Sequence, residues 1–420
     1  MNMKKWFLLF CMSCATIQGV AQEHLQFDGI DLRGNLKEFC QNLEKKGYCF
    51  VKDSLDTRIY RGKFLDHESL VIPRMNQDSL VNDKVKRISD HAFEYCRTRR
   101  IELRDGITSI GKHAFRFCGK LEDVILPTSL TSIEDFAFMG CGELRKVRMS
   151  DQVATLGIGT FMGCKKLAAV DLSDALTSIP EQTFNCCENL KDIDLPNGVT
   201  EIGNMAFERC LRLNKITMPN KVSQIGYSAF YECSNMSAFT LPSEITEIKD
   251  NTFRKCRNLK NVIIQGKTTK IGDYAFADCD GLQTVRIPAV VTRIGQNAFE
   301  NCKSLKQFTV PAKISVLNYA TFRNCKAMSQ VNLPKNLIKI NSSVFENCSQ
   351  LSAINLPKQL KRIGNKSFWG CTNLKKIQYQ GTKEEWNKLP KGASWNWAIP
   401  STTEISCTNG TESQQWVSAN

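Results

Sequence analysis

Large apolar residues recur along the chain at a fixed spacing, and their clearest marker is a phenylalanine followed three positions later by a cysteine. The marker phenylalanines are Phe93, Phe115, Phe138, Phe161, Phe184, Phe207, Phe230, Phe253, Phe276, Phe299, Phe322, Phe345 and Phe368. The first step between them is 22 residues and the other eleven are 23. A self-similar period of this length is typical of a solenoid, in which one small unit is repeated and stacked. The pattern therefore predicts one elongated array of repeats in place of two or three ordinary domains.

The repeated unit follows the frame L-x-x-V-x-L-P-x-x-L-x-x-I-x-x-x-A-F-x-x-C, as in "DGLQTVRIPAVVTRIGQNAFENC" at residues 280–302. In "VRIP", residues 285–288, apolar and polar positions alternate until a proline ends the pattern, which indicates a short strand. Ala275, Phe276 and Cys279 recur at helical spacings, so we expect a single α or 3₁₀ turn on the opposite side of each coil. The predicted fold class is an α/β repeat solenoid of about 13 coils of 23 residues.

A single coil of this kind cannot fold alone. Burial of its roughly six large apolar side chains contributes about 10–18 kcal/mol. Ordering the coil costs about 1.5 kcal/mol for each residue. Neighbouring coils must supply the difference, and strand pairing would stack them about 4.8 Å apart with the phenylalanines in one continuous spine.

The unit, with its Leu-Pro, Ile-Gly, Ala-Phe and Cys landmarks, resembles the BspA-like leucine-rich repeats of exported bacterial proteins over roughly residues 80–380. The resemblance implies a leucine-rich repeat array used for surface adhesion or protein recognition, and it implies no particular ligand. A parallel β-helix has a comparable coil length and is the alternative fold. The helical turn expected at Ala-Phe-x-x-Cys argues against that alternative.

The two ends of the array depart from the repeat. In residues 22–75, a helix is expected over 35–47 between strand-like "FDGIDLRG" and "YCFV", giving a small α/β N-terminal module that covers the first coil of the repeats at 76–380. At 381–410 we expect a C-terminal cap with a helix near 384–389 and a strand near 403–407, an ending that also resembles BspA-like arrays. Trp386, Trp395 and Trp397 are interpreted as packing over the last coil, in preference to a carbohydrate platform. Residues 411–420 are expected to form a flexible tail.

The first residues predict export. Lys4 and Lys5 precede an apolar run, and small residues lead to Ala21, so residues 1–21 are interpreted as a signal peptide. The run is about half as long as the roughly 20 apolar residues of a transmembrane helix. We therefore expect a protein without a transmembrane segment that is periplasmic, secreted or held at the cell surface. Removing the two lysines leaves a net charge of 14 − 2 = +12.

Nineteen cysteines in an exported protein invite a disulfide interpretation, which the spacing opposes. Cysteines in an in-register stack lie about one strand spacing apart. Their Cβ atoms would point in parallel and would not converge to the roughly 3.8 Å of a disulfide. The ladder is predicted to consist of buried free thiols that act as small hydrophobic residues. Cys40 and Cys49 are the one pair considered for a bridge.

The sequence contains little that predicts catalysis. His91 and His113 occupy the same position in adjacent coils, but Phe136 stands where a third metal ligand would be needed, so surface histidines are the preferred interpretation. Phosphate loops, zinc-binding cysteine pairs and nucleophiles with an evident partner are all missing. We expect no enzyme, cofactor or metal, although carboxylates paired across coils remain an open alternative.

Exposed strand residues on a solenoid form a ready binding surface, and here they are mixed, small and polar. This composition favours a protein partner, for example a host or extracellular matrix protein. The candidate partner-binding residues are Arg148, Asp171, Asp194, Ile263 and Arg286. Ile263 is apolar although its neighbours Val262 and Ile264 are expected to face the core, and arginine is favoured at binding hot spots.

The excess positive charge lies elsewhere, near the cysteines, as in "CRTRR" (96–100), "CKK" (164–166) and "FRKCR" (253–257). A basic edge of this kind gives the alternative function, a module that binds a glycan or another polyanion. Nucleic acid is not expected, because few aromatic residues are expected among the exposed positions.

Overall fold

The computed structural model describes residues 86–412 apart from residue 104, and it gives only strands for part of the chain before residue 86. The chain divides into two compact units, an N-terminal unit, Met1–Pro196, and a C-terminal unit, Asn197–Asn420. The helix predicted over 35–47, the side chains of Cys40 and Cys49, and most of the predicted signal peptide and tail lie outside the described residues.

The strands that precede the repeats form two small antiparallel sheets and one parallel pair. Strand β1 (Trp6–Phe10), within the predicted signal peptide, pairs with β5 (Thr57–Gly62), which also pairs with β4 (Cys49–Ser54). The second sheet joins β2 (Gln26–Phe27) to β3 (Ile30–Asp31). Strand β6 (Leu70–Val71) runs parallel to β8 (Arg100–Glu102) of the first coil.

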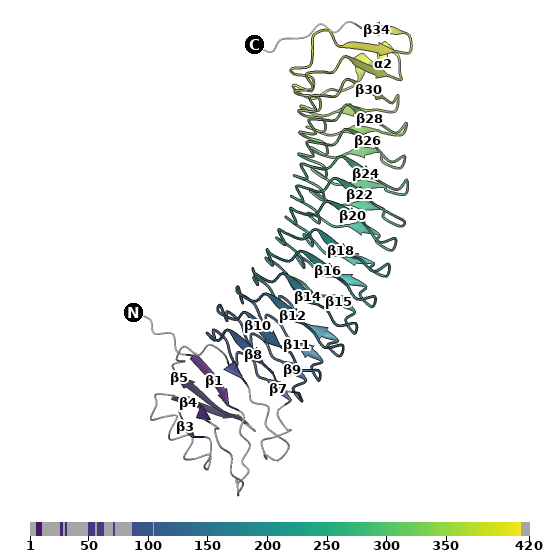
Figure 1. Cartoon of the computed structure of the whole chain (residues 1–420). Coiled ribbons are helices and arrows are strands. Elements are labelled where there is room, and N and C mark those ends of the chain that lie inside the picture. Colours follow the sequence, from purple (N-terminus) through teal and green to yellow (C-terminus); the bar gives the residue numbers. More distant parts are fainter. Residues whose placement is uncertain are drawn as a thin grey trace, which may run out of the picture. The chain divides into compact units, whose positions relative to one another are not determined.

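Each coil contains a first strand of three or four residues and a second strand of two, where the sequence predicted a single strand (Figure 1). The first strands of the N-terminal unit are β8 (Arg100–Glu102), β10 (Asp123–Ile125), β12 (Lys146–Arg148), β14 (Ala169–Asp171) and β16 (Asp192–Asp194). Its second strands are β7 (Arg87–Ile88), β9 (Ser109–Ile110), β11 (Ser132–Ile133), β13 (Thr155–Leu156) and β15 (Ser178–Ile179).

The C-terminal unit repeats this arrangement. Its first strands are β18 (Lys215–Thr217), β20 (Ala238–Thr240), β22 (Asn261–Ile263), β24 (Thr284–Arg286), β26 (Gln307–Thr309), β28 (Gln330–Asn332), β30 (Ala353–Leu356) and β32 (Lys376–Tyr379). Its second strands are β17 (Glu201–Ile202), β19 (Gln224–Ile225), β21 (Glu247–Ile248), β23 (Lys270–Ile271), β25 (Arg293–Ile294), β27 (Val316–Leu317), β29 (Lys339–Ile340) and β31 (Arg362–Ile363). Paired strands are parallel and 23 residues apart, as in Val262↔Val285, so the predicted solenoid of about 13 coils is confirmed.

The helical turn predicted in each coil is wrong. We call the six residues from three before each marker phenylalanine to two after it the turn segment; in the coil of Phe276 it places Tyr274 at φ 56° and Asp278 at φ 61°. Two left-handed residues in every turn segment prevent the consecutive right-handed angles that a helix needs. Successive backbone N–H groups instead donate alternately within the coil and to the next coil. Ala277 donates to Tyr274 O of its own coil at 3.1 Å, and Asp278 donates to Glu300 O of the next coil at 2.8 Å.

The core of each unit is a stack of the marker phenylalanines, as the sequence predicted. Phe276 is fully buried and lies parallel to Phe253 and Phe299, each with a ring-centroid distance of 5.3 Å. In the N-terminal unit, Phe93 and Phe115 stack at 5.2 Å. These contacts join every coil to its neighbours within the unit.

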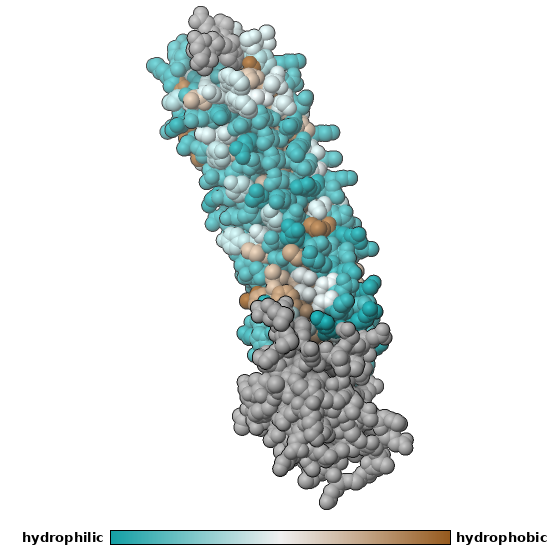
Figure 2. Space-filling model, turned by 90° about the vertical axis from the view of Figure 1, so that its left-hand side faces the viewer, coloured by the Kyte–Doolittle hydropathy of each residue, from teal (hydrophilic) through white to brown (hydrophobic). Residues whose placement is uncertain are grey.

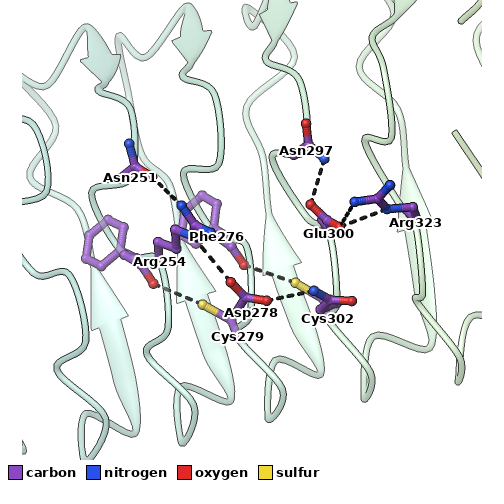
Figure 3. Close-up of polar contacts among 11 residues, drawn as sticks. Asn251, Arg254, Phe276, Asp278, Cys279, Asn297, Glu300, Cys302 and Arg323 are labelled. Atoms are coloured by element: carbon purple, nitrogen blue, oxygen red, sulfur yellow. Dashed lines mark hydrogen bonds and ion pairs between the residues drawn. The ribbon is translucent and has the colours of Figure 1, made fainter. Parts of the chain in front are cut away.

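The cysteine ladder of the described residues consists of buried free thiols, which confirms that prediction. The structure adds a role that the sequence did not reveal. The Cys279 thiol donates to the carbonyl oxygen of Phe253 at 3.1 Å, and the Cys302 thiol to that of Phe276 at 3.2 Å (Figure 3). Cysteine therefore combines a small apolar volume with a weak donor that ties each coil to the preceding one.

A capped helix and one modified coil end the C-terminal unit. Helix α2 (Lys383–Lys388) begins with a capping box between Thr382 and Glu385, and β33 (Glu404–Cys407) pairs with β32 and with β34 (Gly410–Glu412). The helix and strand predicted near 384–389 and 403–407 are confirmed. Phe368 and Gly370 donate to the carbonyl oxygens of Trp395 and Trp397, as one turn segment does to the next.

The tryptophans of this region differ in how deeply they are buried. Trp386 and Trp395 are buried, as the packing interpretation expected. Trp397 also packs on the last coil, where it stacks on Trp369 with a centroid distance of 5.3 Å, but it remains 54% exposed.

Candidate interaction surfaces

The first strands expose the residues on either side of their buried central position, and we call these exposed rows the strand face. Ile263 is 38% exposed while Val262 and Ile264 are buried, as predicted. Ile263 is the register partner of the exposed Arg286 in the next coil. Two of the predicted binding residues are thus adjacent on the C-terminal unit.

Around this pair the strand face of the C-terminal unit carries mainly hydroxyl and amide groups. Thr284 Oγ1 donates to Asn261 Oδ1 at 2.7 Å, and Asn332 Nδ2 donates to Thr309 Oγ1 at 3.1 Å. The exposed positions of its first strands are Lys215, Thr217, Ala238, Thr240, Asn261, Ile263, Thr284, Arg286, Gln307, Thr309, Gln330, Asn332, Ala353, Asn355, Lys376 and Gln378. The uncharged side chains of these strands therefore hydrogen-bond to one another, while Lys376 Nζ lies 3.6 Å from Glu404 Oε1.

The strand face of the N-terminal unit is charged. Asp171 Oδ2 lies 3.1 Å from Arg148 Nε and 3.1 Å from Lys146 Nζ. Hydrogen bonds from Arg148 and Lys146 hold the pKa of the Asp171 carboxyl below its usual value. Asp194 is exposed at the same position of the following coil. The structure thus brings Arg148 and Asp171 together. Their ion pair neutralises part of the charge that the strand face could offer to a partner.

Several residues of the predicted basic edge have carboxylate partners in an adjacent coil. Lys166 Nζ lies 2.7 Å from Glu143 Oε2, and Lys165 Nζ lies 3.3 Å from Glu188 Oε1. Arg254 Nε lies 3.3 Å from Asp278 Oδ2 (Figure 3). These pairs reduce the charge that the edge can offer to a polyanion.

Exposed aromatic residues are more numerous than the sequence interpretation allowed. Tyr227 is 49% exposed and Tyr319 is 41% exposed, and both lie in turn segments of the C-terminal unit. Lys249 Nζ lies 5.0 Å from the Tyr227 ring centroid, and Arg323 Cζ lies 5.9 Å from that of Tyr319. The prediction that few aromatic residues would be exposed near basic residues is therefore wrong for this surface.

The corresponding surface of the N-terminal unit has a different composition. Its turn segments contain the half-buried Tyr95, Phe136, Met139 and Met162 and the exposed Ile158. Seen from the left-hand side of Figure 1, the molecule is mostly hydrophilic and its hydrophobic patches are small (Figure 2). The turn segments thus vary in chemistry along the array.

The two histidines approach each other, as their positions suggested. Their rings stack with a centroid distance of 4.8 Å, and His113 also stacks on Phe136 at 5.3 Å. Burial, with a smaller effect of His91, lowers the pKa of His113. Within residues 86–412, no group of three or more His, Cys, Asp or Glu side chains is arranged to hold a metal ion.

No helix in the described part of the chain is both long enough and apolar enough to pass through a membrane.

Comparison with known proteins identifies the repeat. Residues 86–210, 177–306 and 292–390 match the model of the BspA type leucine-rich repeat region. This match favours a leucine-rich repeat array over a parallel β-helix. The helical turn that was expected to distinguish the two folds is not formed and no longer supports this choice. No curated protein matches the chain at a significant level.

A solved structure of a bacterial leucine-rich repeat protein has the same fold. A leucine-rich repeat protein from Bacteroides ovatus is 24% identical, with a TM-score of 0.60, and the match covers 86% of this chain and 97% of that one. A leucine-rich cell surface protein from Faecalibacterium prausnitzii is 22% identical, with a TM-score of 0.42 and coverage of 83% and 96%. At these identities the likeness concerns the fold.

Proposed function

Because the chain belongs to the family of BspA type leucine-rich repeat proteins, we propose that it is an exported, non-enzymatic recognition protein that binds a protein partner through its strand face. The observation that carries this proposal is Ile263, an apolar side chain exposed on the strand face beside the exposed Arg286. An apolar residue next to an arginine is the kind of pair that dominates protein interfaces. The predicted signal peptide is consistent with a partner outside the cell.

The surroundings of Arg286 also suit a protein partner. Among the described residues, no carboxylate lies within ion-pair distance of its guanidinium group. Contact with a partner costs the neighbouring threonines and asparagines little free energy. The partner's backbone can form the hydrogen bonds that these side chains otherwise make to water. Arg286 can therefore pair with a carboxylate or carbonyl of the partner without first breaking an internal ion pair.

The test compares two double variants of the full chain on immobilised collagen, laminin and fibronectin. Ile263→Ser with Arg286→Ser should leave the free energy of unfolding within about 1 kcal/mol, as for other surface changes. It should weaken binding by roughly tenfold or more, because both residues are predicted hot spots. Lys255→Ser with Arg257→Ser, which changes the basic edge, should leave this binding intact.

The opposite result would replace the proposal. If the basic-edge variant abolishes binding and the strand-face variant does not, the alternative of a glycan- or polyanion-binding module through the coil edge is the better description. Repeating the assay at high salt separates the two, because binding to a polyanion falls steeply with ionic strength and a mixed protein interface responds weakly.

A further inference from the structure

Aromatic side chains occupy the turn segments of alternate coils in the C-terminal unit. Tyr227, Tyr274, Tyr319 and Trp369 belong to the coils of Phe230, Phe276, Phe322 and Phe368, which lie two repeats apart. The turn segments between them hold no aromatic residue besides the core phenylalanine. At the position of Tyr227 and Tyr319, these intervening coils carry Asp250, Gln296 and Ser342. Tyr227 and Tyr319 are exposed three positions before their marker phenylalanines, while the half-buried Tyr274 and Trp369 lie at other positions of their turn segments. We call these four rings the aromatic row.

Every ring of the aromatic row has a cation close to it. Lys249 Nζ is 5.0 Å from the ring centroid of Tyr227, and Arg254 Cζ is 4.9 Å from that of Tyr274. Arg323 Cζ lies 5.9 Å from the Tyr319 ring. Lys366 Nζ lies 6.0 Å from the Trp369 ring. A fifth contact joins Lys255 Nζ to the ring of Tyr231 at 5.1 Å. Such contacts orient the rings and place positive charge beside each of them.

The five cations differ in the charge that they can offer. Arg254 pairs with Asp278, and Arg323 forms an ion pair with Glu300 (Figure 3). Within the part of the chain that the structure describes, no carboxylate lies at ion-pair distance from Lys249, Lys255 or Lys366. The aromatic row thus has uncompensated positive charge at both ends, next to Tyr227 and next to Trp369.

The spacing of the aromatic row restricts the kind of polymer that fits it. Two coils span about 10.6 Å at the turn segments, because the ring centroid of Phe276 lies 5.3 Å from those of both Phe253 and Phe299. An extended peptide presents side chains on one face every 6.6 Å or so, which does not match. The repeat of a β-linked disaccharide is close to the two-coil spacing. Sugar rings stack their C–H faces on aromatic side chains, and their hydroxyl groups bond to carboxylate, amide and hydroxyl side chains such as those of Asp250, Gln296 and Ser342.

We propose that the aromatic row is a binding site for an acidic polysaccharide with a disaccharide repeat and uronate or sulfate groups. Each second sugar stacks on a ring of the row, and its acidic groups pair with Lys249, Lys255 and Lys366. Trp397 stacks on Trp369 and remains exposed, so it enlarges the aromatic surface at this end of the row. This site lies outside the strand face, so it is independent of the proposed protein partner.

The first test measures binding of the full chain to hyaluronan and heparin, with neutral dextran as the uncharged control. Tyr227→Ala with Tyr319→Ala should weaken binding of an acidic polysaccharide by roughly tenfold, because two stacking contacts are lost. The matched variant Tyr227→Phe with Tyr319→Phe keeps both rings and should bind normally. Ile158→Ala changes the same repeat position in the N-terminal unit and should also have no effect.

The second test uses oligosaccharides of increasing length and a charge variant. Affinity should rise from the disaccharide to the octasaccharide, which reaches all four rings, and then level off. Lys249→Ser with Lys255→Ser should weaken binding and make it less sensitive to salt, because fewer counterions are released. Ile263→Ser with Arg286→Ser, which tests the protein-binding surface, should leave polysaccharide binding unchanged.

Three results would overturn the proposal. The first is that neither hyaluronan nor heparin binds at physiological salt. The second is binding that the tyrosine and lysine variants leave unchanged. The third is tighter binding of poly-glutamate or single-stranded DNA than of either polysaccharide with the same dependence on Tyr227 and Tyr319, which would assign the row to another polyanion.

Discussion

The strand faces of the two units have the same backbone and opposite side-chain chemistry. In the N-terminal unit, Arg148, Lys146 and Asp171 form ion pairs across neighbouring strands. In the C-terminal unit, Thr284 and Asn261 form a hydrogen bond between uncharged groups at equivalent positions. The buried positions are confined to a few residue types by packing, while the exposed rows are free to vary. What distinguishes one part of the array from another is therefore found in the exposed rows.

The largest effect that we expect is alkaline unfolding, because buried thiols with a raised pKa lie in both units, among them Cys118 and Cys164 in the N-terminal unit. Burial raises the pKa of the Cys256 thiol to about 12 and raises that of Cys233 and Cys279. A folded pKa above the unfolded value means that stability is complete below about pH 9 and is lost as the pH rises toward 12. Each such thiol contributes a slope of about 1.4 kcal/mol per pH unit. Circular dichroism from pH 8 to 12 should show cooperative loss of structure.

Thiol labelling provides the control for this prediction. The ladder cysteines should react slowly in the native protein and rapidly after denaturation, because only the thiolate is reactive. Cys96, in the first coil, is 5% exposed and should be labelled before the fully buried Cys256. Mass spectrometry that finds six or more bridged pairs, or a fold unchanged at pH 12, would contradict this description.

The second largest effect should come from truncating a core phenylalanine, and it should be greater in the middle of the C-terminal unit than at the start of the N-terminal unit. Phe276→Ala should cost about 3–5 kcal/mol of unfolding free energy, because the ring is buried between two stacked neighbours. Phe93→Ala should cost less, because its ring is slightly exposed and contacts the next marker ring, Phe115, on one side. Urea denaturation of both variants measures the difference. Equal shifts would show that stacking on both sides does not determine the cost.

A smaller effect should separate the two strand faces by their response to salt. Asp171→Asn removes the charge at the centre of two ion pairs and should destabilise the protein by about 0.2–1 kcal/mol at low salt. The loss should shrink at high salt, because exposed ion pairs are screened. Asn261→Ala in the C-terminal unit should show the same small change at both salt concentrations. If the two variants respond alike, the electrostatic contrast between the faces has no energetic consequence.

The smallest effect concerns the histidine stack in the first coils. Burial lowers the pKa of His113, so the stability that it contributes is present above its unfolded pKa near 6.5 and declines as the pH falls below that value. Nearby charges act in both directions: His91 and Arg116 lower this pKa, and Glu94 and Asp135 raise it. His113→Phe should reduce the loss of stability between pH 7 and pH 5. A urea midpoint with unchanged pH dependence would argue against this role.

The sequence was sufficient to predict the features that recur in every coil with the same packing. The phenylalanine spine, the free thiols and the exposure of Ile263 follow from the spacing of apolar residues, since a fixed period leaves few ways to bury them. The family resemblance was drawn from the same landmarks, and the matched repeat model confirms it.

The turn segment could not be predicted from the same spacing. Residues such as Tyr274 and Lys366 adopt left-handed angles, at φ 56° and φ 54°, although their side chains give no indication of it. Asn297 and Gly159 occupy the equivalent left-handed position and were the available signal, because asparagine and glycine tolerate this conformation. The aromatic row was missed for a related reason. Its rings and cations come partly from different coils, and their exposure depends on a backbone that was interpreted as helical.

The hydrogen bonds between turn segments also have an evolutionary consequence. Phe253 donates to Ala275 O as Phe276 donates to Ala298 O, so the two coils present interchangeable edges to their neighbours. Unequal crossing-over that adds or removes one unit of 23 residues in the gene would restore every partner on both sides of the junction. A change of another length within a strand would turn core side chains outward, whereas the 22-residue step from Phe93 to Phe115 keeps both rings stacked. The lineage can therefore lengthen or shorten its exposed rows in whole steps, while each row evolves its own chemistry by point mutation.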